Sequence, residues 1–263
     1  MQRIAQEMHF SETTFITSEE ERNGGYDVRV FTPETELPFA GHPTLGTAYV
    51  LQKEIIHKPS TTIKLNMKVG QIPVTFTFRK GKVDLLWMKQ KAPIFGREFE
   101  PKPVGKLLGL ALSDLDLDLP IMEVSTGVPF IIVPLQSLKA VQNVQIERNN
   151  FLEFVRNIDA KSLLIFTRQT YHKENDLNVR VFVPTFGVPE DPATGSGNGC
   201  LAAYLVQYQY FEKNQIDVRV EQGYELDRKS LLYLKSTKTN KEIEVNVGGK
   251  VQFIAKGELL YNH

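Results

Sequence analysis

The chain has 263 residues, of which 41% are hydrophobic and 24% charged, as is usual for a soluble globular protein. Lys plus Arg and Asp plus Glu are equal at 31 each, and no segment concentrates basic residues among aromatic ones. This balance disfavours a nucleic-acid or membrane partner and favours a small-molecule substrate. No apolar run reaches the roughly 18 residues that span a bilayer, and there is no secretory leader, so we expect a cytoplasmic protein.

Cysteine and histidine usage disfavours a metal site. The single cysteine, Cys200, excludes an internal disulfide and any multi-thiolate site. The five histidines are scattered, without the spacing of a ligand pair. We therefore expect no metal site.

The first part of the chain predicts a helix followed by strands. Residues 1–10 carry a helical apolar pattern, and residues 23–25 (Asn-Gly-Gly) form a turn between two β-branched runs. Residues 91–104 contain three prolines and no periodicity, which indicates a crossover between two halves, 1–95 and 96–263. The strands predicted before this crossover cover residues 13–17, 26–31, 63–65, 74–78 and 83–88.

The second part predicts short helices at 104–112 and 149–157 within a β-rich chain. Two further helices, at 44–52 and 199–208, lack a polar face over much of their length, so we expect both to be buried inside a curved sheet. The strands predicted here cover residues 130–134, 163–166, 179–183, 218–220, 231–235, 242–247 and 251–254.

A repeat links the two halves. The segment Asp-Val-Arg-Val-Phe-Thr-Pro at 27–33 returns as Asn-Val-Arg-Val-Phe-Val-Pro at 178–184. Each copy is followed by a Gly/Pro-rich turn and then by one of the two apolar helices. The sequence therefore predicts an internal duplication of two pseudo-symmetric halves, each with strands and one buried helix.

The two turns are candidate substrate-binding sites. A helix N-terminus has unpaired N–H groups and a positive dipole end, and both favour anions. We expect Gly41, Gly195 and Ser196 to bring such N–H groups to a substrate, with His42 and Asp191 at matched positions on a shared cleft. Two plainer alternatives remain, a structural histidine at 42 and a helix N-cap at 191.

Three segments resemble the signature stretches of the PhzF-like (phenazine biosynthesis) family: HFSETTF, ELPFAGHPTLGTA and VPEDPATGSGNG. The resemblance covers essentially the whole chain. It implies the diaminopimelate-epimerase type of fold, an α+β fold of two pseudo-symmetric halves in which each half is a curved mixed sheet wrapped round a central buried helix. It implies that Glu12 is the catalytic acid/base, although spacing alone gives this loop residue no special role. It also assigns Gly41, His42 and Asp191 to the cleft and the anion site to Gly195 and Ser196.

By the same resemblance, the chain is a metal- and PLP-independent isomerase, and we expect a homodimer acting on a small carboxylate-bearing metabolite. Phe10 and Phe15 are expected to form apolar walls around Glu12. The family's usual first strand is not present ahead of residue 1, and a C-terminal strand near 255–263 is the candidate to complete the sheet. The alternatives are an impaired anion-binding protein and an amino-acid epimerase, the latter disfavoured because Cys200 has no partner thiol.

Overall fold

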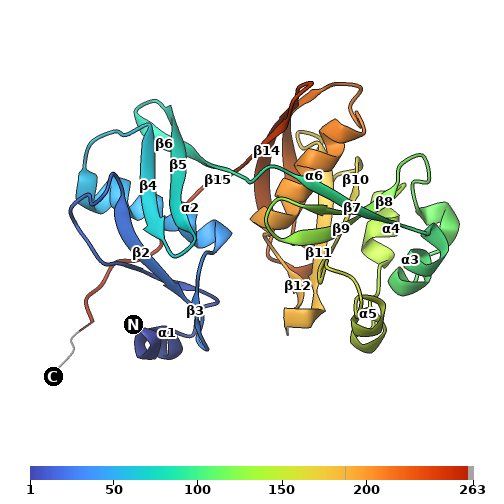
Figure 1. Cartoon of the computed structure of the whole chain (residues 1–263), viewed down its shortest axis with the longest axis horizontal. Coiled ribbons are helices and arrows are strands. Elements are labelled where there is room, and N and C mark those ends of the chain that lie inside the picture. Colours follow the sequence, from blue (N-terminus) through green and yellow to red (C-terminus); the bar gives the residue numbers. More distant parts are fainter. Residues whose placement is uncertain (187, 260–263) are drawn as a thin grey trace. The chain divides into compact units, whose positions relative to one another are not determined.

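The structure is a computed structural model that describes residues 1–186 and 188–259, which form two compact units. The first unit contains residues 1–38, 43–86 and the described residues from 249 onward, and the second contains 39–42 and 87–248. Each unit contributes a series of adjacent strands and one apolar helix (Figure 1). The α+β fold expected from the sequence is confirmed.

In the first unit the strands follow the order β1-β2-β4-β5-β6, with the short β3 on β2. Strand β2 pairs antiparallel with β1 and β3 and parallel with β4, which pairs antiparallel with β5. The helix α2 continues into a π-helix at Leu51–Ile56. The elements are α1 (Gln2–Met8), β1 (Thr13–Ile16), β2 (Tyr26–Phe31), β3 (Glu36–Leu37), α2 (Gly41–Val50), β4 (Thr62–Met67), β5 (Gly70–Arg79) and β6 (Lys82–Lys89). The first two residues of α2 and the last three of β6 are counted with the second unit.

In the second unit the order is β15-β14-β13-β11-β10-β9-β8-β7, with β12 on β11. Helices α3 (Pro101–Leu108), α4 (Leu138–Asn143) and α5 (Arg148–Phe154) precede the long α6 (Gly195–Gln207). The strands are β7 (Ile94–Phe99), β8 (Ile121–Ser125), β9 (Pro129–Pro134), β10 (Leu163–Thr167), β11 (Leu177–Val183), β12 (Val188–Asp191), β13 (Gln215–Gln222), β14 (Ser230–Lys238) and β15 (Ile243–Gly249).

The strands around β2 and β11 have the same topology. Like β2, β11 pairs antiparallel with the strand before it and with a short strand after it, and parallel with the strand that follows the apolar helix. Val30 lies opposite Leu37 in the first unit, and Val181 lies opposite Asp191 in the second. The sequence repeat at 27–33 and 178–184 therefore marks strands in equivalent places, and Leu37 is the counterpart of Asp191.

Both copies of the repeat carry an Arg–Glu pair between these strands. Arg29 donates from Nε and Nη2 to the two carboxylate oxygens of Glu36, both at 2.8 Å. Arg180 donates in the same way to Glu190, at 3.0 and 2.8 Å. The first pair is partly open to solvent, with side chains 47% and 16% exposed, whereas the second is buried at 10% and 7%.

The two apolar helices differ in burial. Every residue of α6 from Gly197 to Val206 is buried, and the helix packs against β8, β9, β10, β13 and β14. In α2 only Thr44, Thr47 and Ala48 are buried. In the described part of the first unit the strand order ends at β1, so nothing corresponds to β8 and β9 beside α2. The expectation of a fully buried helix holds for α6 and only in part for α2.

Several predicted boundaries are corrected. Residues 91–104 include β7, which pairs with β8, so this segment is more than a crossover. Residues 251–254 form no strand, and neither do 255–259, while 260–263 lie outside the described residues. Both apolar helices begin earlier than expected, at Gly41 and Gly195, because their Gly-rich turns already belong to the first helical turn. Within the described residues, no helix combines the length and apolar character that a bilayer crossing requires.

Candidate active site

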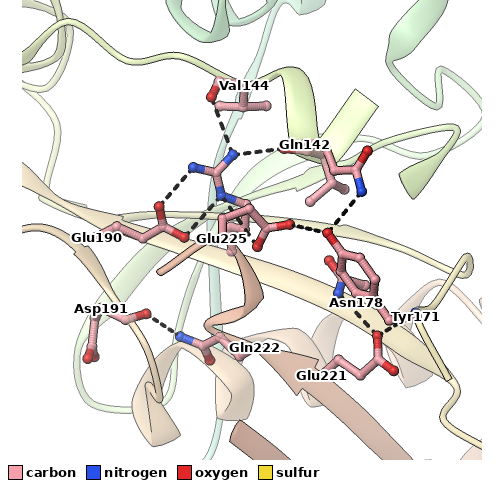
Figure 2. Close-up of polar contacts among 11 residues, drawn as sticks. Gln142, Val144, Tyr171, Asn178, Glu190, Asp191, Glu221, Gln222 and Glu225 are labelled. Carbon is pink, nitrogen blue, oxygen red and sulfur yellow. Dashed lines mark hydrogen bonds and ion pairs between the residues drawn. The ribbon is translucent and has the colours of Figure 1, made fainter. Parts of the chain in front are cut away.

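Asp191 is the last residue of β12 and lies opposite Val181 of β11. Its carboxylate accepts a hydrogen bond of 2.6 Å from the hydroxyl of Thr194. Its main-chain carbonyl accepts one of 2.7 Å from Nε2 of Gln222, a contact visible in Figure 2. The side chain is half-buried. These hydrogen bonds hold Asp191 in place beside the start of α6.

Thr194, not Asp191, is the N-cap residue of α6. The threonine hydroxyl makes no capping bond to the helix, because it donates to Asp191 and accepts from Nε2 of Gln222 at 3.0 Å. No side chain therefore caps the first turn, which contains Gly195 and Ser196, among the described residues. The plain alternative that Asp191 merely caps this helix is wrong.

Gln222 and Asn198 complete the polar network behind this turn. Both side chains are fully buried. Gln222 Oε1 accepts from the Thr194 N–H at 3.2 Å and from Asn198 Nδ2 at 2.8 Å. Asn198 Nδ2 also donates to the Thr194 carbonyl at 3.0 Å. Sequence reasoning missed Thr194, Asn198 and Gln222, because their contacts bring the start of α6 to the end of β13, and no local pattern in the sequence gives that pairing.

Glu12 lies in the first unit, immediately before β1, and is half-buried. The register of β1 on β2 places Thr13 opposite Phe31, which holds the chain next to Glu12 in a regular sheet. Phe15 packs edge-on against Phe31, with ring centroids 5.4 Å apart. Phe10 is 60% exposed, so the expectation that it forms an apolar wall is wrong.

Gly41 and His42 are the first two residues of α2, and His42 is exposed. His42 is therefore a helical residue, whereas Asp191 ends a strand ahead of its helix. The expectation that these two residues occupy matched positions is wrong, because the strand register pairs Asp191 with Leu37 instead. The structure brings Asp191, Gly195 and Ser196 together at one helix start, and Glu12 belongs to the other unit.

Cys200 lies in the second turn of α6 and is fully buried. Its sulfur lies 3.7 Å from the Thr126 hydroxyl. Burial raises the pKa of the thiol to about 11. A protonated and inaccessible thiol is a poor proton acceptor, so Cys200 serves as a packing residue of the core.

Comparison with known proteins gives consistent matches along the chain. A family model described as "Phenazine biosynthesis-like protein" (PhzC-PhzF) matches residues 1–257. The chain is 31% identical over 255 residues to the uncharacterized isomerase YfhB of Bacillus subtilis, covering 95% of this chain and 84% of that protein. It is 31% identical over 258 residues to trans-2,3-dihydro-3-hydroxyanthranilate isomerase of Pseudomonas aeruginosa, covering 98% and 87%. A solved structure of a Bacillus anthracis phenazine biosynthesis protein of the PhzF family is similar at a TM-score of 0.87 and 28% identity, covering 99% and 88%.

Proposed function

Because the chain belongs to the phenazine biosynthesis-like (PhzF) family, we propose that it moves a proton between two carbons of a small carboxylate-bearing metabolite. It is an isomerase, as its relatives are. One of these is named for a cyclic amino acid, trans-2,3-dihydro-3-hydroxyanthranilate. A cyclic or amino-acid-like carboxylate is therefore the substrate class that we assign to this chain.

The uncapped start of α6 is the observation that carries the proposal. The Thr194 hydroxyl is engaged with Asp191 and Gln222, so the first-turn N–H groups keep their capacity to bind an anion. We assign the substrate carboxylate to the N–H groups of Gly195 and Ser196. Gly41, at the start of α2, is the corresponding binding residue of the first half.

Glu12 is the proposed acid/base. A carboxylate can take a proton from one carbon and, once protonated, return a proton to another, so no metal or organic cofactor is needed. Its place at the start of a paired strand gives the carboxylate a rigid support. His42 and Asp191 are proposed to orient the polar groups of the substrate. The homodimer and the cytoplasmic location stay predictions.

The test is the replacement Glu12→Gln, which keeps the shape of the side chain but cannot accept a proton. With trans-2,3-dihydro-3-hydroxyanthranilate in heavy water, deuterium incorporation followed by NMR is expected to fall by at least about 100-fold, since acid–base catalysis contributes about 10²- to 10⁴-fold. The affinity for anthranilate, an unreactive aromatic analogue, is expected to be unchanged.

The matched control is Glu7→Gln, the same change on the exposed helix α1. It is expected to leave both exchange and binding at wild-type values. Exchange that continues in Glu12→Gln at the wild-type rate removes Glu12 from the mechanism. A wild-type protein that binds anthranilate but exchanges no proton is instead the impaired anion-binding protein considered above.

A further inference from the structure

We propose that Gln222 is a positioning residue, which holds Asp191 and the first turn of α6 in the arrangement that the reaction needs. The proposal rests on the function proposed above, because it concerns the same site. Gln222 is fully buried at the end of β13, and its side-chain amide is hydrogen-bonded to Asp191, Thr194 and Asn198.

The hydrogen bonds fix the orientation of the amide. Nε2 of Gln222 donates to the carbonyl of Asp191 at 2.7 Å, and a carbonyl can only accept. Oε1 accepts from the main-chain N–H of Thr194 at 3.2 Å, and this group can only donate. Rotating the amide by half a turn would place Oε1 against the Asp191 carbonyl, two acceptors, and Nε2 against the Thr194 N–H, two donors. Only the observed orientation is therefore stable.

The fold explains why this residue reaches the site. Strands β12 and β13 both pair with β11, Asp191 opposite Val181 and Gln222 opposite Val179. The ends of the two strands therefore meet within a few residues along β11. Gly223, with φ of 81°, turns the chain there, and a Cβ on it would lie 2.8 Å from the Pro192 carbonyl oxygen. Only glycine permits this close approach.

The first unit shows that the fold itself does not require an amide at this place. There the parallel register pairs Tyr26 with Leu65 and Asp27 with Asn66, so Met67 is the counterpart of Gln222. The Met67 sulfur accepts a hydrogen bond from the Thr44 hydroxyl, with 3.6 Å between the sulfur and the oxygen. The amide thus occurs in the half that carries Asp191, and methionine in the half that carries Leu37. This difference indicates that Gln222 serves the site and not the fold.

The Gln222 amide fixes the orientation of the Thr194 hydroxyl. Its Nε2 occupies a lone pair of the Thr194 hydroxyl, whose proton goes to the Asp191 carboxylate. Without Gln222, the hydroxyl would be free to rotate and accept from an N–H of the first turn of α6, as N-cap threonines do. That bond would compete with a bound carboxylate, and the rotation would move the hydroxyl away from the Asp191 carboxylate. Gln222 therefore keeps the helix start open for the substrate.

The test is Gln222→Met, which installs the residue that the first unit already holds. We expect Kd for anthranilate, measured by calorimetry, to rise at least about tenfold, and deuterium exchange into trans-2,3-dihydro-3-hydroxyanthranilate to fall with it. The control is Gln215→Met, the same change at the exposed start of the same strand, which is expected to change neither. Wild-type Kd and exchange in a folded Gln222→Met variant would overturn the proposal.

A second pair of variants covers the case in which Gln222→Met fails to fold. Thr194→Ser keeps the hydroxyl, and Thr194→Val removes it while preserving shape. If Gln222 acts through Thr194, Thr194→Ser retains wild-type affinity and Thr194→Val loses about tenfold; equal affinities would refute the link. Glu12→Gln separates this proposal from the proposed function. It is expected to lower exchange at least about 100-fold without changing Kd, whereas Gln222→Met changes Kd.

Discussion

Removing one partner of the buried ion pair Arg180–Glu190 is expected to destabilise the second unit far more than the same change at the more exposed pair destabilises the first. The Arg180 guanidinium also donates from Nη1 to the carbonyls of Val141 and Val144, at 2.9 and 3.3 Å. A second carboxylate, that of Glu225, lies 3.9 Å from its Nε. Figure 2 shows the carboxylates of Glu190 and Glu225, which both contact this guanidinium. Removing the arginine would leave the largely buried carboxylates of Glu190 and Glu225 without this cation.

We therefore expect Arg180→Met to lower the free energy of unfolding by about 3 to 5 kcal/mol, the cost of breaking a buried pair from one side. The single tryptophan, Trp87, reports on this unit, because it is buried there beside Tyr233. Urea unfolding followed by tryptophan fluorescence measures the change. Arg180→Met combined with Glu190→Leu and Glu225→Leu is expected to recover much of the loss, since apolar side chains of similar volume carry no desolvation penalty.

The control is Arg29→Met, the same change at the equivalent place in the first unit, followed by circular dichroism. Its effect is expected to be small, because the pair is open to solvent and because Lys68 also contacts Glu36, at 2.7 Å. Equal losses in the two variants would refute the argument from burial.

Two further predictions concern titrating groups. Hydrogen bonds from Arg29, then from Lys68, lower the pKa of Glu36 from 4.5 to about 2, so the stabilising effect of this carboxylate is fully present above pH 4.5 and is lost as the pH falls towards 2. An NMR titration of Arg29→Met is expected to show the Glu36 pKa moving back up, and an unchanged value would contradict the assignment. Burial raises the pKa of Cys200 to about 11, so iodoacetamide at pH 8 is expected to alkylate the folded protein at least about 100-fold more slowly than the urea-unfolded chain. Mass spectrometry of this single-cysteine chain reads the rate directly, and equal rates would show that the thiol is accessible.

The repeated strands and the two apolar helices could be predicted because their signals are local. The alternation at 27–31 and 179–183 is that of half-buried and buried strands, and both segments are strands in the structure. The helix starts were placed too late because glycine and proline are typical of turns, although proline is well tolerated in a first helical turn. The strand at 94–99 was missed because it follows a proline and its register with β8 is interrupted.

The chemistry of the site was only partly visible in the sequence. The family signatures identified Asp191 and the Gly195–Ser196 turn, and the structure places these residues together. The matched positions assumed for His42 and Asp191 were wrong, because His42 is the second residue of α2, whereas Asp191 lies four residues before the start of α6. Gln222 could not be found, since its contact with Asp191 depends on two strands sharing one edge of β11. Such long-range register is a property of the assembled sheet.

The division of the chain has a consequence for its synthesis. The first unit takes in residues from 249 onward, where Lys256 contacts Glu54 at 2.6 Å and Lys53 lies 3.5 Å from the ring centroid of Phe253. These residues leave the ribosome after the whole of 87–248. The first unit therefore gains its last residues after the second unit has been synthesised in full, so the second unit can finish folding first. A chain released early would lose contacts from its amino-terminal portion.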